Sequence, residues 1–200
     1  SCTSVVLGLA GGYCAGKDAV AAILAERGFR VIDVDGVGHR VLREPEAREL
    51  VAARFGPEVL APDGEVDRRK LGGRVFRNRR ELAELERIVH PRMVQRVREE
   101  LSAAPGPVVV NAALLFRMGL DRLCGAVLCV RAPWWARLAR ARRRDGLGLV
   151  QGLRRIASQR GICPKLPGPG VDIYYVDNAG GPDALRERVL RLVREKGLGN

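Results

Sequence analysis

The chain has 200 residues, of which 46% are hydrophobic, so it can bury a substantial core as one domain or as one domain with small insertions. Its formal net charge of +12 comes almost entirely from arginine, but only 4% of the residues are aromatic, which leaves few side chains to stack on bases and argues against a nucleic-acid partner. The longest apolar runs fall short of the roughly 20 residues that span a bilayer, and the five cysteines contain no C-x-x-C pair, so we expect a cytoplasmic protein with reduced thiols and no membrane contact.

A glycine-rich turn follows the first apolar run. Residues 5–9 predict a buried strand and residues 19–25 predict a helix, and a G-x-x-x-x-G-K sequence lies between them. This context is typical of a phosphate-binding loop, where backbone N–H groups and the positive end of the helix bind nucleotide phosphates. A purely structural glycine turn is the alternative. We expect the turn to bind ATP through the residues Gly11, Gly12, Tyr13, Cys14, Ala15, Gly16, Lys17 and Asp18.

The residue after Lys17 departs from the usual loop. A Ser or Thr is expected there, because its hydroxyl holds Mg²⁺, but this chain has Asp18. A carboxylate can ligate Mg²⁺ directly. It also adds like charge beside the β-phosphate, which costs on the order of 4 kcal/mol at about 4 Å and an effective dielectric near 20. Asp18 is therefore either a Mg²⁺ ligand or a residue that weakens ATP binding.

A second short strand is predicted over residues 30–35, and it ends in carboxylates. Alternation along a strand would point Asp33 and Asp35 to the same side, across from the phosphate loop. One carboxylate could accept a proton from an attacking hydroxyl, and the other could orient that hydroxyl or hold Mg²⁺ through water. We expect Asp33 to be catalytic. Asp35 either joins this site or caps a helix that begins near Gly36.

Helical patterns fill the middle of the chain. They cover residues 45–56 and then 67 to about 103, where His90-Pro91 is expected to break the helix in two. A turn is predicted at 61–64. A histidine before a proline is either structural, through a bond to the backbone, or catalytic.

Strand and helix signals alternate in the second half of the chain. Strands are predicted at 108–110, 126–130 and 173–176, and helices after Pro133 and over 149–159 and 182–196. With the first two strands, this predicts an α/β fold with a five-stranded parallel sheet flanked by helices, whose ligands bind at the C-terminal strand ends.

Three arginines of the helix after Pro133 have helical spacing. Arg137, Arg140 and Arg144 are three and four residues apart, so they share one face. They form either a lid that binds phosphates or a solvated face.

Several segments, in order along the chain, resemble the dephospho-coenzyme A kinase family. They are the glycine-rich turn, Asp33-Val34-Asp35 with His39-Arg40, D-G-x-x-D-R-R-x-L at 63–71, His90-Pro91, Leu114-Leu115-Phe116, Arg144-Asp145-Gly146, R-I-x-x-Q at 155–159 and Asp177-Asn178-Ala179-Gly180. The resemblance covers essentially the whole chain. The 63–71 segment, the His-Pro pair and the 155–159 segment are far more specific than the phosphate loop.

The resemblance implies a P-loop kinase in three parts. They are a nucleotide-binding core at about 1–35, 104–132 and 171–200, a helical acceptor-binding insertion at about 60–103, and a small lid at about 137–165. The implied reaction transfers the γ-phosphate of ATP to the 3′-hydroxyl of dephospho-CoA. The implied cofactor is Mg²⁺, and the expected partners are ATP and dephospho-CoA alone, with a monomer favoured.

Site residues follow from the same resemblance. Lys17 and Asp33 are expected to be catalytic, with Asp33 as the general base, and Arg140 and Arg144 match lid arginines that bind ATP. The acceptor is expected to contact the residues Asp35, Arg40 and His90.

The chain departs from the family pattern at several positions. Asp18 stands where a hydroxyl residue is usual, Cys14 where the family has Gly, and Asn111 where an Asp is often seen. Lys17 and Asp33 are intact, which favours an active enzyme. The alternatives are another small-metabolite or nucleoside monophosphate kinase, a nucleotide-binding homologue weakened by Asp18, and a basic nucleic-acid-associated protein.

Overall fold

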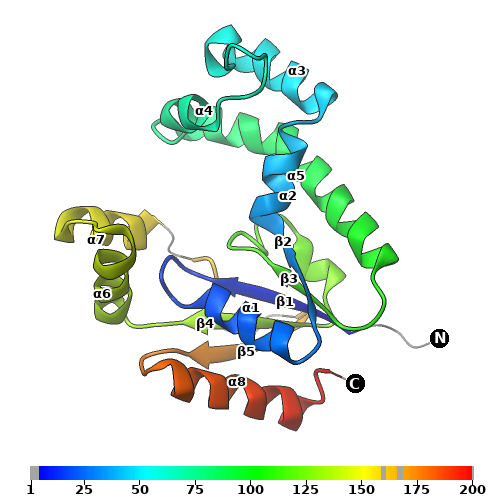
Figure 1. The fold of residues 1–200 in the computed structure, drawn as a ribbon, viewed down its shortest axis with the longest axis vertical. Helices are drawn as coiled ribbons and strands as arrows, with labels where there is room; N and C mark the ends of the chain where they lie inside the picture. The colour runs from blue at the N-terminus through cyan, green and yellow to red at the C-terminus, as the bar shows by residue number, and fades with distance from the viewer. Residues whose placement is uncertain (1–4, 159–160, 166–168, 200) are drawn as a thin grey trace. The chain divides into compact units, whose positions relative to one another are not determined.

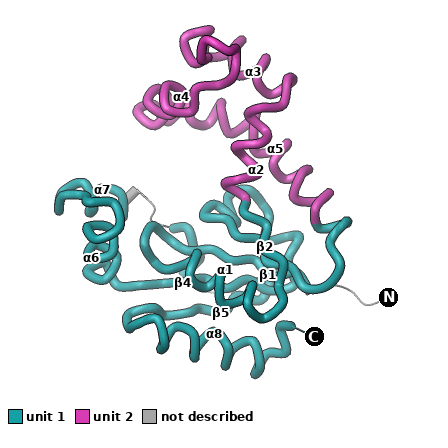
Figure 2. Tube along the Cα trace, in the orientation of Figure 1, with its two compact units in different colours: residues 1–33, 101–200 teal, residues 34–100 magenta. Residues whose placement is uncertain are grey.

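The computed structural model describes residues 5–158, 161–165 and 169–199 (Figure 1). The expectations for Cys2, for Gln159 and for residues 166–168 lie outside these ranges. The chain divides into two compact units: residues 1–33 with 101–200 form unit 1, and residues 34–100 form unit 2 (Figure 2).

Unit 1 is built on a five-stranded parallel sheet. Its strands are β1 (Val6–Gly11), β2 (Arg30–Asp33), β3 (Val108–Asn111), β4 (Ala126–Arg131) and β5 (Asp172–Asp177), in the order β2-β3-β1-β4-β5. Strand β3 is buried along its whole length, as expected for a parallel sheet covered on both faces. The predicted α/β class with a parallel sheet is confirmed.

The helices of unit 1 are α1 (Lys17–Glu26), α6 (Trp134–Asp145), α7 (Leu149–Ser158) and α8 (Pro182–Lys196), with the short 3-10 helix η2 (Leu120–Leu123). Helices α6 and α7 pack on each other and lie beside the sheet rather than over one of its faces (Figure 1). Apolar residues of α1 and α8 pack with those of the strands in one core, whose members include Leu9, Leu24, Leu128 and Val189. This packing fixes the end of β1 and the start of α1, between which the glycine-rich turn lies.

Unit 2 is helical in its described residues. It contains α2 (Val34–Val41), α3 (Pro45–Phe55), the 3-10 helix η1 (Pro57–Val59), α4 (Arg68–Val75) and most of α5 (Arg79–Ala103). It has a core of its own, formed by the buried residues Val51, Phe55, Val59, Leu71 and Val75. The unit therefore includes α2 and α3 as well as residues 60–100 of the 60–103 segment singled out from the sequence.

The second strand is shorter than its sequence suggested. It ends at Asp33, and α2 begins at Val34, so Asp35 lies in the first helical turn. The expectation that strand alternation points both carboxylates the same way was wrong. The reason is that Val34, Val37 and Val41 have helical spacing and are all buried, which favours a helix from residue 34.

The expected helix break at His90-Pro91 was also wrong, because Pro91 lies inside α5. The break comes earlier, at 76–78, where the side chain of Asn78 accepts bonds from the N–H groups of Arg80 (3.0 Å) and Glu81 (3.3 Å) and caps α5. A proline removes one backbone bond, and burial of Met93 and Val97 on the following turns keeps the helix continuous.

The D-G-x-x-D segment has local structural roles. The Asp63 carboxylate accepts the N–H of Glu65 at 3.0 Å, and Leu60 and Val66 form an antiparallel bridge around the turn. Asp67 then caps α4 by accepting two backbone N–H groups at 3.0 and 3.1 Å.

Candidate active site

The glycine-rich turn has left-handed backbone at two residues. Gly16 has φ of 104°, and Cys14 has φ of 56°, the only positive φ of a non-glycine residue in the described chain. A Cβ on Gly16 would lie 2.2 Å from the amide nitrogen of Asn178, so both its backbone and its surroundings require glycine. Cys14 adopts this backbone at a cost of order 1–3 kcal/mol, a strain that is typical of ligand-binding turns.

Two arginines of α6 hold the carbonyls of this turn. The Nε atom of Arg137 donates to the Tyr13 carbonyl at 2.8 Å, and the Nη1 atom of Arg140 donates to the Cys14 carbonyl at 3.1 Å. A carbonyl and the next N–H point in opposite directions across a trans peptide. Fixing the carbonyls toward α6 therefore turns the following N–H groups the other way.

Asn178 completes this support. The side-chain amide nitrogen of Asn178 donates to the Ala15 carbonyl at 2.9 Å. The backbone carbonyl of Asn178 accepts from Nη2 of Arg140 at 2.8 Å. The first helical bond of α1 runs from the N–H of Val20 to the carbonyl of Gly16 at 3.2 Å, so the N–H groups of 17–19 have no carbonyl partner within the helix. The turn and the helix start thus form a cradle suited to an anion.

Arg137 also carries an orphaned donor. Its Nη2 atom is buried and, within the described structure, has no hydrogen-bond partner. Burial lowers the pKa of Arg137 below its usual value. Because an unpaired buried charge is costly, an anionic group bound at the turn would stabilise this guanidinium.

Lys17, Asp18 and Asn111 form a hydrogen-bonded cluster beside the turn. The ammonium of Lys17 lies 2.5 Å from the Asn111 side-chain oxygen and 3.2 Å from the Asp18 carboxylate. The Asn111 amide nitrogen donates to the same carboxylate oxygen at 3.1 Å. Burial alone would raise the pKa of Asp18, but the bond from Asn111 and the charge of Lys17 outweigh it, so the pKa is lowered and the group is ionised at neutral pH.

Asp33 is the last residue of β2, and it is exposed. In the sheet it pairs with Asn111, the last residue of β3, which in turn pairs with Leu9 of β1. The predicted base, the lysine cluster and the glycine-rich turn therefore meet at the carboxyl ends of three neighbouring strands.

The remaining predicted residues lie in two other places. Asp35, Arg40 and His90 belong to unit 2, and Arg40 pairs with the carboxylate of Glu100 at 2.6 Å. Arg144 lies at the end of α6, where it donates to Asp145 at 3.2 Å.

Tyr13 connects the turn to the helices α6 and α7. Its hydroxyl donates to the Asp145 carboxylate, and the guanidinium groups of Arg144 and Arg155 each lie 5.4 Å from the centre of its ring. Hydrogen bonds from Tyr13 and Arg144 hold the pKa of Asp145 below its usual value. The arginine-rich helix is therefore not merely a solvated face, because it binds the turn through both backbone and side chain.

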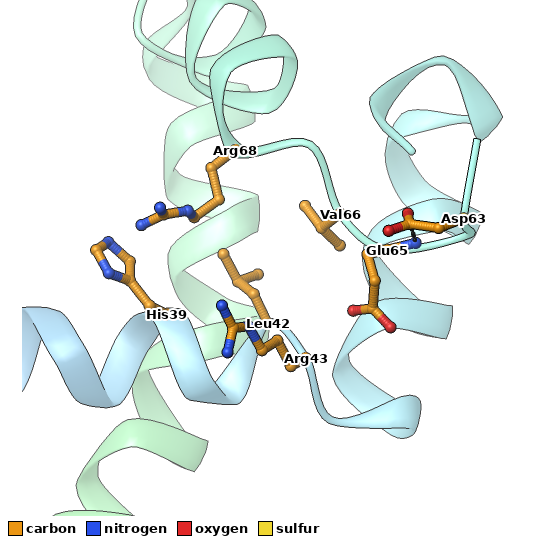
Figure 3. Close-up of a pocket in the computed structure, with 7 residues that line it drawn as sticks. All are labelled: His39, Leu42, Arg43, Asp63, Glu65, Val66 and Arg68. Atoms are coloured by element: carbon orange, nitrogen blue, oxygen red, sulfur yellow. Dashed lines mark hydrogen bonds between the residues drawn. The ribbon is translucent and has the colours of Figure 1, made fainter. Parts of the chain in front are cut away.

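Unit 2 has a cavity of about 300 Å³ next to the D-G-x-x-D segment (Figure 3). Figure 3 shows the side chain of His39 pointing toward the guanidinium of Arg68. The lining residues are His39, Leu42, Arg43, Asp63, Glu65, Val66 and Arg68. With two arginines and a histidine beside the carboxylates of Asp63 and Glu65, this cavity offers both donors and acceptors to a polar ligand.

Comparison with known proteins identifies the family. The profile of the dephospho-CoA kinase family matches residues 5–166. The chain belongs to the dephospho-CoA kinase family. It is therefore a kinase.

Relatives and solved structures agree with this family. A dephospho-CoA kinase of Anaeromyxobacter dehalogenans is 39% identical over 95% of this chain and 91% of its own length. One of Carboxydothermus hydrogenoformans is 32% identical over 95% and 93%. A crystal structure of a Thermus thermophilus protein has a TM-score of 0.79 at 32% identity, covering 96% of this chain and 97% of its own.

Sequence reasoning missed some of the side chains that build this site. Asn178 was noticed only as part of a family segment, Arg137 only as a neighbour on a helix face, and Asn111 only as a departure from the family. Asn111 and Asn178 are the two buried polar residues of the described chain. Buried asparagines bound to backbone or charged groups are a signal of support for a site, but burial is not visible in one sequence.

No group of three or more His, Cys, Asp or Glu side chains in the described chain is arranged to hold a metal ion. No helix among these residues is both long and apolar enough to cross a bilayer.

Proposed function

We propose that this kinase transfers the γ-phosphate of ATP to the 3′-hydroxyl of dephospho-CoA to give coenzyme A. The observation that carries the proposal is the meeting of the phosphate loop, the Lys17 cluster and Asp33 at three adjacent strand ends. In a member of the dephospho-CoA kinase family, this arrangement supports the proposal because the turn would serve as a phosphate cradle, Lys17 as a cation and Asp33 as a base, the parts that phosphoryl transfer requires.

On the nucleotide side, residues 11–18 would bind the triphosphate through backbone N–H groups and the ammonium of Lys17. Lys17 would neutralise charge that develops on the transferring phosphoryl group. Arg137 would gain a partner for its orphaned nitrogen, and Arg144, which is exposed at the end of α6, would bind phosphate oxygens. Arg140 would support ATP binding by fixing the turn, since three carbonyls of Cys14, Ala15 and Asn178 already accept its protons.

On the acceptor side, Asp33 would accept the proton of the attacking 3′-hydroxyl. Asp35, Arg40 and His90 would contribute to acceptor binding. The unit 2 cavity adds Arg43 and Arg68, whose guanidinium groups suit the phosphates of dephospho-CoA.

Mg²⁺ fits the residues beside the turn. The Asp18 carboxylate is ionised and its side chain is 78% exposed, and Mg²⁺ is usually held by one or two carboxylates together with substrate phosphates. Bound with ATP, the ion would supply positive charge that offsets the phosphate charge.

The test is a coupled assay with ATP, Mg²⁺ and one of three acceptors: dephospho-CoA, AMP or CMP. We expect turnover with dephospho-CoA and at least about 100-fold lower kcat/KM with the two nucleotides, a difference of about 2.7 kcal/mol in transition-state binding. Comparable turnover with AMP or CMP would instead make the chain a nucleoside monophosphate kinase. No turnover with any acceptor would make it a nucleotide-binding homologue.

A further inference from the structure

P-loop enzymes hold Mg²⁺ with two kinds of side chain. A Ser or Thr follows the loop lysine, and an Asp comes from a second segment. In this chain the residue after the lysine is Asp18, and the side chain that contacts it from β3 is Asn111. A carboxylate and a neutral polar side chain are both present, but the carboxylate follows the loop lysine and the neutral side chain lies at the end of β3.

We infer that Asp18 and Asn111 act as one exchanged metal-binding pair, in which Asp18 supplies the carboxylate and Asn111 positions it. This inference rests on the proposed function, because it takes ATP with Mg²⁺ as the substrate. In this pair Asn111 is a positioning residue of the reaction. The residue type that functions at position 18 then depends on the residue type at position 111, and the reverse.

Geometry supports the pair. The two residues are 93 positions apart in sequence, yet the Asn111 amide nitrogen lies 3.1 Å from the Asp18 carboxylate. Asn111 is only 6% exposed, whereas the Asp18 side chain is 78% exposed. The buried amide of Asn111 therefore fixes the position of the Asp18 carboxylate from its protein side and leaves that carboxylate accessible to a hydrated ion.

Charge explains why the two residue types go together. With Asp18 present, an aspartate at position 111 would place two carboxylates at hydrogen-bond distance, and both would attract the ammonium of Lys17, which already lies 2.5 Å from Asn111. With a serine in place of Asp18, Asn111 would leave the cluster without a carboxylate. Only combinations with one carboxylate balance Lys17 and still offer a charged ligand to Mg²⁺.

A double-mutant cycle tests the pair by equilibrium binding without an acceptor. The four proteins are the wild type, Asp18→Ser, Asn111→Asp and the double variant, and the probe is a non-hydrolysable ATP analogue titrated in EDTA and at a series of Mg²⁺ concentrations. Asp18→Ser should raise the Mg²⁺ concentration needed for half-maximal analogue affinity by about tenfold or more, since the carboxylate is lost. Asn111→Asp alone, with Asp18 still in place, should weaken metal-free binding by about tenfold or more.

The deciding result is the double variant. We expect Asn111→Asp to harm the wild type but to rescue the Asp18→Ser variant, returning its Mg²⁺ requirement to within about threefold of the wild type. If the two changes simply add, so that the double variant is no better than Asp18→Ser, the pair is not coupled and the inference is wrong. An unchanged Mg²⁺ requirement in Asp18→Ser would also overturn it.

Two controls keep the cycle interpretable. Asp183→Asn removes an exposed carboxylate from the first turn of α8. It should change neither the metal-free affinity for the analogue nor the Mg²⁺ concentration needed for half-maximal affinity. If Asn111→Asp fails to fold, Asp18→Asn still tests the carboxylate, because it changes charge with little change of shape at an exposed position and should raise the Mg²⁺ requirement as Asp18→Ser does.

The cycle and the proposed function can fail separately. If the cycle shows coupling but no coenzyme A is formed, the metal-binding pair is supported and the kinase uses another acceptor. Formation of coenzyme A with additive variants would leave the proposed function in place and remove the pair.

Discussion

Lys17 is shared between two side chains, those of Asn111 and Asp18. Its ammonium lies 2.5 Å from the Asn111 oxygen and 3.2 Å from the Asp18 carboxylate, and its side chain is 14% exposed. ATP bound at the turn, as proposed, would draw the ammonium toward its phosphates and away from Asp18. The exchange is feasible because a triphosphate carries more negative charge than one carboxylate, and Mg²⁺ would take over the partner that Lys17 leaves.

Replacing Lys17 tests this role. Lys17→Ala should lower kcat by about 10³-fold or more, because the transferring phosphoryl group loses its neutralising cation. The fold should remain, as judged by the melting temperature. Lys196→Ala, at the end of α8, is the matched control and should leave turnover unchanged. Near-normal activity of Lys17→Ala would refute the phosphate-loop assignment.

Asp33 and Asp35 should differ in which kinetic constant they affect. Asp33→Asn should lower kcat by roughly 10²–10⁴-fold with little change in ATP affinity, the usual range for a general base. Asp35→Asn, in the first turn of α2, should mainly raise the KM for dephospho-CoA. Steady-state kinetics with each substrate varied in turn distinguish the two, and an Asp33 variant altered only in KM would make Asp33 a binding residue.

At the scale of elements, α6 supports the glycine-rich turn. Its residues Arg137 and Arg140 donate to three successive carbonyls of the turn, so the position of α6 and the shape of the turn are coupled. Each such bond contributes about 0.5–1.5 kcal/mol, more when the donor is charged. The bonds to the turn thus stabilise both the position of α6, which is polar on most of its surface, and the conformation of the turn.

Removing one of these donors should loosen the turn. Arg140→Ala leaves the carbonyls of Cys14 and Asn178 without this donor and should weaken ATP-analogue binding by about tenfold, with a lower melting temperature. Arg143→Ala, exposed on the same helix, removes equal charge and should change analogue affinity less than about twofold. Equal losses in both variants would indicate a general charge effect.

Nucleotide should also order the predicted lid. We expect amide hydrogen exchange in α6 and α7 to slow when an ATP analogue is added, because phosphate contacts of Arg144 and Arg137 would restrain both helices. Exchange in α8, which packs on the sheet core, serves as the internal control. Equal exchange in α6 and α7 with and without analogue would contradict a lid that responds to ATP.

At the scale of the whole molecule, each unit has an apolar core among its described residues. The core of unit 2 centres on Phe55, which is 1% exposed, while that of unit 1 joins the sheet to α1 and α8. Each core therefore stabilises a different part of the proposed site: the glycine-rich turn in unit 1 and the proposed acceptor-side residues in unit 2.

This division predicts a selective defect. Phe55→Ala should cost about 3–5 kcal/mol, the usual range for a buried phenylalanine, and should lower the protection of amides in α3 and α4. ATP-analogue binding should persist, while the KM for dephospho-CoA should rise strongly. The exposed Phe76→Ala is the control and should leave protection of α3 unchanged. Loss of analogue affinity in step with loss of acceptor binding would mean that the two cores unfold together.

The sequence by itself determined the parallel sheet, the position of most of its strands and the glycine-rich turn between the first strand and helix. Apolar runs next to a glycine-rich turn can be recognised one segment at a time, because alternation, helical spacing and the need for glycine are local properties. The family followed from ordered segments such as 63–71, parts of which proved to be a turn and a helix cap. Local rules failed where burial decided the outcome, at Val34 and at Pro91.

Only the tertiary structure decided which distant side chains meet. Nothing near Lys17 in the sequence indicates Asn111, 94 residues away, and nothing near the turn indicates Arg137 or Asn178. These contacts arise because parallel strands bring their carboxyl ends to one edge of the sheet, whatever their separation along the chain. The same sheet brings Asp18, which looks misplaced in the loop sequence, beside an amide at the end of β3. The role inferred for Asp18 depends on its contact with Asn111, and that contact exists only in the folded chain.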